Sequence, residues 1–185
     1  YRRVMIVTDA VLVKLGLVEP LRQVLLAQGI DVAVHDGITP DPTYPVLQAG
    51  YEAVRAHRSD AILAVGGGSA IDAAKVIGAM AVSGKSPAKL IGMLKVGKPM
   101  LPLFAIPTTA GTGSEVTVAA VVTDPVQHVK SAVIDPKLVP LAAALAFLAM
   151  AECQTFLGAR DADIHQPPLL LDLAVFYAFP VRQDT

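Results

Sequence analysis

The stretch AVGGGSAIDAAK, Ala64–Lys75, places three consecutive glycines between an apolar run and a helical pattern. The run Ala61–Val65 predicts a buried strand. After the glycines, apolar residues recur at the spacing of one helix face, namely Ala70, Ala73, Ala74, Ile77 and either Met80 or Ala81. We therefore expect a strand that turns tightly into a helix over Ser69–Val82.

The glycines have two interpretations at this turn. Gly67, Gly68 and Ser69 suit a pyrophosphate, because glycine lets the backbone approach a phosphate and a helix start offers unpaired N–H groups. Alternatively, the turn binds nothing, Ser69 caps the helix and Asp72 is an acidic residue of its first turn. The pattern is neither GxGxxG nor a Walker loop, so the motif alone does not decide between them.

The rest of the chain alternates short apolar runs with helical patterns. This alternation predicts βαβ units and an α/β fold, with a parallel sheet and helices on both faces. Glycines and prolines place Ser83–Pro102 in a surface loop. The expected strands are Val4–Thr8, Asp31–His35 and Leu103–Ile106, with a hairpin of Val116–Val122 and Lys130–Ile134; helical spacing covers Asp9–Gln28, interrupted near Gly16 and Pro20, and Tyr44–His57.

A second loop, PTTAGTGSEVT at Pro107–Thr117, is rich in glycine and hydroxyl groups and follows another expected strand. Because ligands bind at the carboxyl ends of parallel strands, the two loops can converge on one nucleotide-type ligand. An ordinary polar loop is the alternative. Asp9 ends the first strand, where its carboxylate would accept from ribose hydroxyls and repel a 2′-phosphate, or would cap the next helix.

Composition narrows the possible partners and the compartment. The 185 residues are 54% hydrophobic and 17% charged with a net charge of −1, which argues against a nucleic-acid or membrane partner. The single cysteine, Cys153, excludes an intrachain disulfide and fits a cytoplasmic protein, as a buried or incidental thiol rather than a nucleophile. We expect no transmembrane helix and no signal peptide, and the opening Tyr1 suggests a fragment.

Five motifs then occur in order: VTDA, DGITPDPT, GGGSAIDAAK, PTTAGTGSEVT and TDPVQHVKSAVID. In this order and spacing they resemble the iron-containing (group III) alcohol dehydrogenases, especially the lactaldehyde reductase branch, from about Val4 to Leu145. The resemblance implies a Rossmann-like dinucleotide-binding domain over 1–145. It also implies an NAD-dependent oxidoreductase that interconverts small-molecule alcohols with aldehydes or ketones, and a possible homodimer. PTTAGTGSEVT argues against glycerol dehydrogenase or dehydroquinate synthase, which are relatives on the same fold.

The resemblance also implies roles for individual residues. Asp9 corresponds to the aspartate that holds the adenosine ribose and favours NAD over NADP, and Lys130 to a lysine near the cofactor ribose and phosphate. Asp41 departs from the family's usual asparagine, which would weaken one cofactor contact. The other implied contacts are the pyrophosphate turn, Gly67, Gly68, Ser69 and Asp72, and the nicotinamide ribose and adenine contacts, Thr108, Thr109, Thr112 and Thr117.

The resemblance ends before the family's helical domain, which binds Fe²⁺ or Zn²⁺ through one aspartate and three histidines. Residues 146–185 form a divergent tail that does not align, so we expect dinucleotide binding without efficient hydride transfer. A frameshift, a truncation, a deletion or true divergence would each produce such a tail. Asp161, Asp163 and His165 could form a makeshift metal site, although a solvated turn is favoured. An inert fragment that self-associates through the apolar stretch Leu169–Phe179, which could also pack on the sheet edge, is the non-enzyme alternative.

Overall fold

The computed structural model describes residues 1–145 and 177–180. They form one sheet in the order β2-β1-β3-β5-β8-β9 and a smaller sheet in the order β4-β7-β6. The first five strands of the large sheet are parallel, and β9 is antiparallel to β8. The strands are β1 Arg3–Val7, β2 Asp31–His35, β3 Ala61–Gly66, β4 Gly92–Met93, β5 Leu103–Pro107, β6 Ala119–Thr123, β7 Lys130–Ile134, β8 Ala142–Leu145 and β9 Tyr177–Pro180. The helices are α1 Ala10–Lys14, α2 Glu19–Ala27, α3 Tyr44–His57, α4 Gly68–Ser83, α5 Pro87–Leu90 and the 3₁₀ turn η1 Pro136–Leu138.

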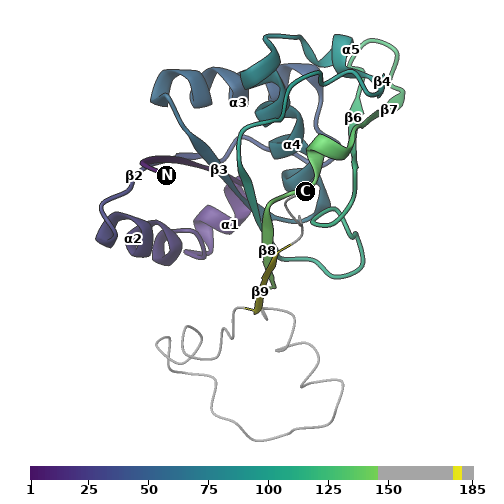
Figure 1. Cartoon of the computed structure of the whole chain (residues 1–185). Helices are drawn as coiled ribbons and strands as arrows, with labels where there is room; N and C mark the ends of the chain where they lie inside the picture. Colours follow the sequence, from purple (N-terminus) through teal and green to yellow (C-terminus); the bar gives the residue numbers. More distant parts are fainter. Residues whose placement is uncertain (146–176, 181–185) are drawn as a thin grey trace, which may run out of the picture.

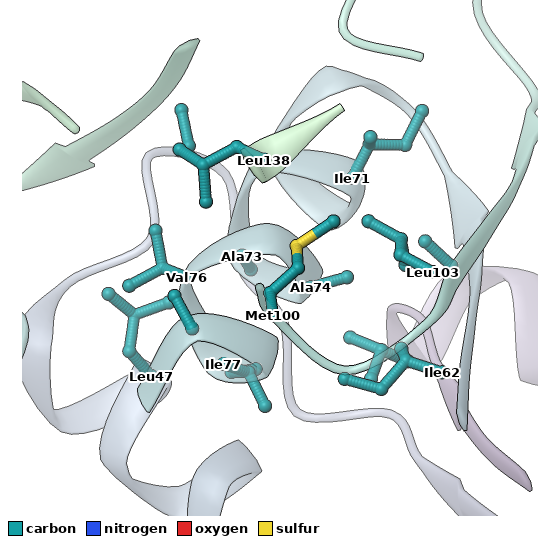
Figure 2. Close-up of a cluster of buried hydrophobic side chains, with 14 of the residues drawn as sticks. Leu47, Ile62, Ile71, Ala73, Ala74, Val76, Ile77, Met100, Leu103 and Leu138 are labelled. Atoms are coloured by element: carbon teal, nitrogen blue, oxygen red, sulfur yellow. The ribbon is translucent and has the colours of Figure 1, made fainter. Parts of the chain in front are cut away.

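Helices cover both faces of the large sheet, which confirms the predicted fold class. Figure 1 shows α3 and α4 on one side of the sheet and α1 and α2 on the other. Because side chains alternate along a strand, Ile62 and Ala64 of β3 point into the core under α3 and α4. Val65 joins the smaller core under α1 and α2. Figure 2 shows the larger core, where Ile71, Ala74 and Ile77 of α4 meet side chains from the sheet and from α3.

Helix α4 is the most deeply buried element. Every residue from Ala70 to Met80 is buried, not only the predicted apolar face. The sheet covers one side of the helix, and α3 and β6 pack against its other sides. Its many alanines and Gly78 allow this close packing, since a helix buried on all sides is apolar all round. Two charged residues, Asp72 and Lys75, are consequently buried with it.

The predicted hairpin is present as β6 and β7, with Thr123 paired to Lys130. Its first strand begins at Ala119 rather than at Val116, so the predicted boundary is wrong. The reason is a turn in which the Val116 N–H donates to the Gly113 carbonyl at 3.0 Å. The sequence pattern also missed β4, which adds to β7 as a parallel strand.

Two further expectations need correction. The segment Ser83–Pro102 is not simply a surface loop, because it contains α5 and β4 and buries Leu90, Val96 and Met100. The sequence predicts no strand after Ile134, yet the alanine-rich run Ala142–Leu145 forms β8 beside β5. Tyr177–Pro180, at the end of the apolar tail, pairs with β8 at the sheet edge.

None of the helices in the described ranges is both long enough and apolar enough to cross a bilayer. Cys153 and the earlier part of the apolar stretch Leu169–Phe179 lie outside the described residues.

Candidate functional site

The glycine turn joins β3 to α4 at the carboxyl edge of the sheet. Gly66 has a φ of 150°, and an added Cβ there would lie 2.7 Å from the Cβ of Ala70. Gly67 is the N-cap residue of α4, and as a glycine it has no side chain with which to cap the helix. The alternative in which Ser69 caps the helix is therefore wrong, and the first turn of α4 contains no acidic residue. The backbone N–H groups at the start of this 16-residue helix therefore receive no acceptor from an N-cap side chain.

The glycine turn and the Thr-rich loop touch, as the sequence predicts. The Thr108 N–H donates to the Gly66 carbonyl at 3.0 Å. A Cβ on Gly67 would lie 3.1 Å from the Thr109 hydroxyl, and one on Gly68 would lie 3.1 Å from the Ser114 hydroxyl. Glycine is needed here because the second loop occupies the space of a side chain.

An open groove of about 350 Å³ lies where these loops meet the hairpin. It contains several of the predicted site residues, the hydroxyl-bearing Ser114 of the second loop, and Pro42 and Val121, which the sequence analysis did not assign. Gly67, Thr108, Thr109, Thr117 and Asp9 are not part of its lining. The predicted residues that line it are Asp41, Gly68, Ser69, Asp72, Thr112 and Lys130.

Asp9 follows β1 and caps α1. Its Oδ1 accepts from the N–H groups of Val11 at 2.9 Å and Leu12 at 3.0 Å. The capping role considered from the sequence is therefore present. It does not exclude a ligand role, because both recorded hydrogen bonds use Oδ1. The second oxygen, Oδ2, lies 3.7 Å from the ideal Cβ position of Gly66, beside the glycine turn.

Asp72 points a buried carboxylate into the groove. The side chain is 9% exposed, and its Oδ2 accepts from the Val121 N–H at 2.9 Å. Its Oδ1 is buried and has no hydrogen-bond partner among the described residues. Burial raises the pKa of this carboxyl, while the Val121 N–H, the charge of Lys75 and the hydroxyl of Ser114 act in the opposite direction.

Lys75 was not assigned from the sequence. Its side chain is fully buried, and its Nζ donates to the Thr117 carbonyl at 2.8 Å, the Thr117 hydroxyl at 3.1 Å and the Ala119 carbonyl at 2.8 Å. Burial lowers its pKa to about 8, against the opposing charges of Asp72 and Glu115. Lys75 therefore holds the backbone of Thr117 and Ala119 at the start of β6. It also binds the hydroxyl of Thr117, a residue that does not line the groove.

Asp41 and Lys130 meet on the rim of the groove. The Lys130 Nζ lies 2.6 Å from the Asp41 Oδ1, and both side chains are more than half exposed. Asp41 has a φ of 53°, the left-handed region that aspartate and asparagine tolerate better than most residues. The two residues that the resemblance places near a cofactor therefore form an ion pair with each other.

Within residues 1–145 and 177–180, no three His, Cys, Asp or Glu side chains lie close enough to hold a metal ion. Asp161, Asp163 and His165 of the considered makeshift site lie outside the described residues.

Comparison with known proteins identifies relatives of this chain. It is 41% identical over 142 residues to the NAD-dependent methanol dehydrogenase of Bacillus methanolicus, a match that covers 77% of this chain and 37% of the relative. It is 37% identical over 142 residues to the lactaldehyde reductase of Escherichia coli, covering 76% and 37%. The chain thus spans little more than a third of the length of these relatives.

Solved structures of related enzymes have the same fold as this chain. A 1,3-propanediol oxidoreductase superposes with a TM-score of 0.74 at 33% identity, covering 78% of this chain and 37% of that one. A sulfoacetaldehyde reductase from Bifidobacterium kashiwanohense, solved in complex with NAD⁺, superposes with a TM-score of 0.65 at 31% identity, covering 78% and 38%. The family model for iron-containing alcohol dehydrogenases matches residues 1–146, and the chain belongs to that family.

Proposed function

We propose that residues 1–145 form a dinucleotide-binding unit that takes NAD(H) at the groove. The observation that carries this proposal is the N-terminus of α4, which has no side-chain cap and opens onto the groove beside Lys130. Such a helix end favours an anion, because its backbone N–H groups and its dipole both point at the ligand.

The groove residues fit a dinucleotide in their chemistry. Gly68 and Ser69 present the helix end to a pyrophosphate, and Lys130 adds a positive charge. Thr112 and Ser114 also line the groove beside Gly68, and their hydroxyls can donate to ligand oxygens or accept from ligand hydroxyls.

Asp9 supports NAD over NADP. Its Oδ2, which takes no part in the capping bonds, can accept from a ribose hydroxyl, whereas a 2′-phosphate would bring a second negative charge against the carboxylate. The capping bonds hold the carboxylate in place at the end of β1, so selection would not require the side chain to move.

With NAD as hydride carrier, we propose that the protein interconverts small alcohols with aldehydes or ketones, as the names of the relatives suggest. Iron, which the family name implies, has no donor set within the described residues. The part of this proposed function that the described residues account for is therefore the binding of the cofactor. A homodimer and a cytoplasmic location remain predictions from the sequence.

Isothermal titration calorimetry of the full chain with NADH and NADPH tests this proposal. We expect NADH to bind and NADPH to bind more weakly. Asp9→Asn should reduce the preference for NADH by about tenfold, because it removes the charge that repels the 2′-phosphate. This substitution retains an oxygen that can cap α1, so the melting temperature should barely change.

Absence of binding for both nucleotides would contradict the proposed function. If the wild type and Asp9→Asn prefer NADH over NADPH to the same extent, the groove still binds nucleotides, but Asp9 does not select between them. A lower melting temperature for Asp9→Asn would show that the capping of α1 requires the negative charge of Asp9.

A further inference from the structure

The ion pair of Asp41 and Lys130 joins two walls of the groove. Asp41 lies in the loop before α3, and Lys130 is the first residue of β7. Thr123 anchors both backbones, because its N–H donates to the Pro42 carbonyl at 2.9 Å and the residue pairs with Lys130 across the hairpin. The 2.6 Å contact therefore joins two segments whose backbones are both anchored to Thr123.

Lys130 is the sole cation among the described residues that line the groove, and its lining also includes two carboxylates, Asp41 and Asp72. A phosphate at the start of α4 would draw its counter-charge from Lys130. In this structure Asp41 already neutralises that lysine. A bound phosphate must compete with Asp41 for Lys130, or accept a lysine whose charge is offset.

We propose that Asp41 sets the affinity of the groove for phosphate-bearing ligands by competing with them for Lys130. The inference rests on the proposed nucleotide-binding function and specifies which side chain limits its strength. The pair is exposed to solvent, where such ion pairs are weak and are screened by salt. The competition should therefore change affinity by about fivefold, and not by orders of magnitude.

The test uses ADP as a charged probe and adenosine as a neutral one, with calorimetry on the full chain. Asp41→Asn keeps the size of the side chain and tolerates the positive φ, so the loop should keep its shape. The matched control is Asp31→Asn, which removes the same charge from an exposed aspartate at the start of β2, where it pairs with Arg3 and His57 and is not part of the groove lining.

Asp41→Asn should bind ADP about fivefold more tightly than the wild type at low ionic strength, and the gain should shrink as salt is added. Adenosine affinity should not change, and Asp31→Asn should behave as the wild type. In a Lys130→Gln background, Asp41→Asn should give a much smaller gain, because the lysine for which the carboxylate competes is gone.

The outcomes separate the two proposals. If the wild type and Asp41→Asn bind ADP equally well, the competition is refuted while the groove remains a nucleotide site. A gain of the same size in the Lys130→Gln background also refutes it, because Asp41 would then act by simple repulsion. If neither protein binds ADP, the proposed function fails and the competition fails with it.

Discussion

Gly66→Ala should destabilise the protein by about 3 kcal/mol, which for a domain of this size lowers the melting temperature by about 10 °C. Two costs combine. The φ of 150° lies where residues other than glycine are strained. The new methyl would also lie 2.7 Å from the Cβ of Ala70, which is fixed to the helix backbone and cannot rotate away. Thermal and urea unfolding of the full chain measure the loss.

Gly84→Ala is the matched control for this prediction. Gly84 ends α4 with a φ of 67°, and an added Cβ there meets nothing within 4 Å. Backbone strain alone should cost about 1 kcal/mol. If the two variants lost equal stability, the close approach between the glycine turn and the first turn of α4 would not explain the loss at Gly66.

The fold was largely predictable because its signals are local. The runs in β1, β2 and β3 are apolar and β-branched, and the glycines mark the turn into α4 directly. Elements that depend on distant partners were missed. β4 has two residues and exists through its pairing with β7, and the alanines of β8 become a strand only beside β5. A residue pattern carries no signal for such pairing.

The candidate site was predicted in part for the same reason. Gly68 and Ser69 were found because glycine and hydroxyl groups at strand ends suggest a phosphate. Lys75 was missed because a lysine in an alanine-rich helix is indistinguishable in sequence from a solvated one. A partial signal was present: Lys75 follows Asp72 by three residues in a helix that is otherwise apolar over Ala70–Met80. Two charges on one face of such a helix indicate buried polar contacts.

Lys75→Met should cost about 2–3 kcal/mol, because methionine keeps the apolar stem and removes the donors that serve Thr117 and Ala119. Removing the buried ammonium leaves the carbonyl groups of Thr117 and Ala119 without their donor. The control is Lys98→Met, at an exposed lysine, which should change the free energy of unfolding by less than about 0.5 kcal/mol. Urea unfolding at neutral pH compares the two. Equal stability of both variants would show that β6 does not depend on the buried ammonium.

The stability difference between the wild type and Lys75→Met should grow with pH. Lys75 has a pKa of about 8 in the folded chain, against 10.5 for an ordinary lysine, because burial penalises its charge. Between these values the unfolded chain binds more protons than the folded chain, so the free energy of unfolding rises with pH. The full rise is at most about 3 kcal/mol, and below pH 8 it is absent. Subtracting the Lys75→Met curve removes the titration of other groups, such as Tyr44, whose pKa burial raises. A difference that stays flat between pH 8 and 10 would mean that Lys75 holds its proton equally well in both states, and that water reaches the ammonium that the structure buries.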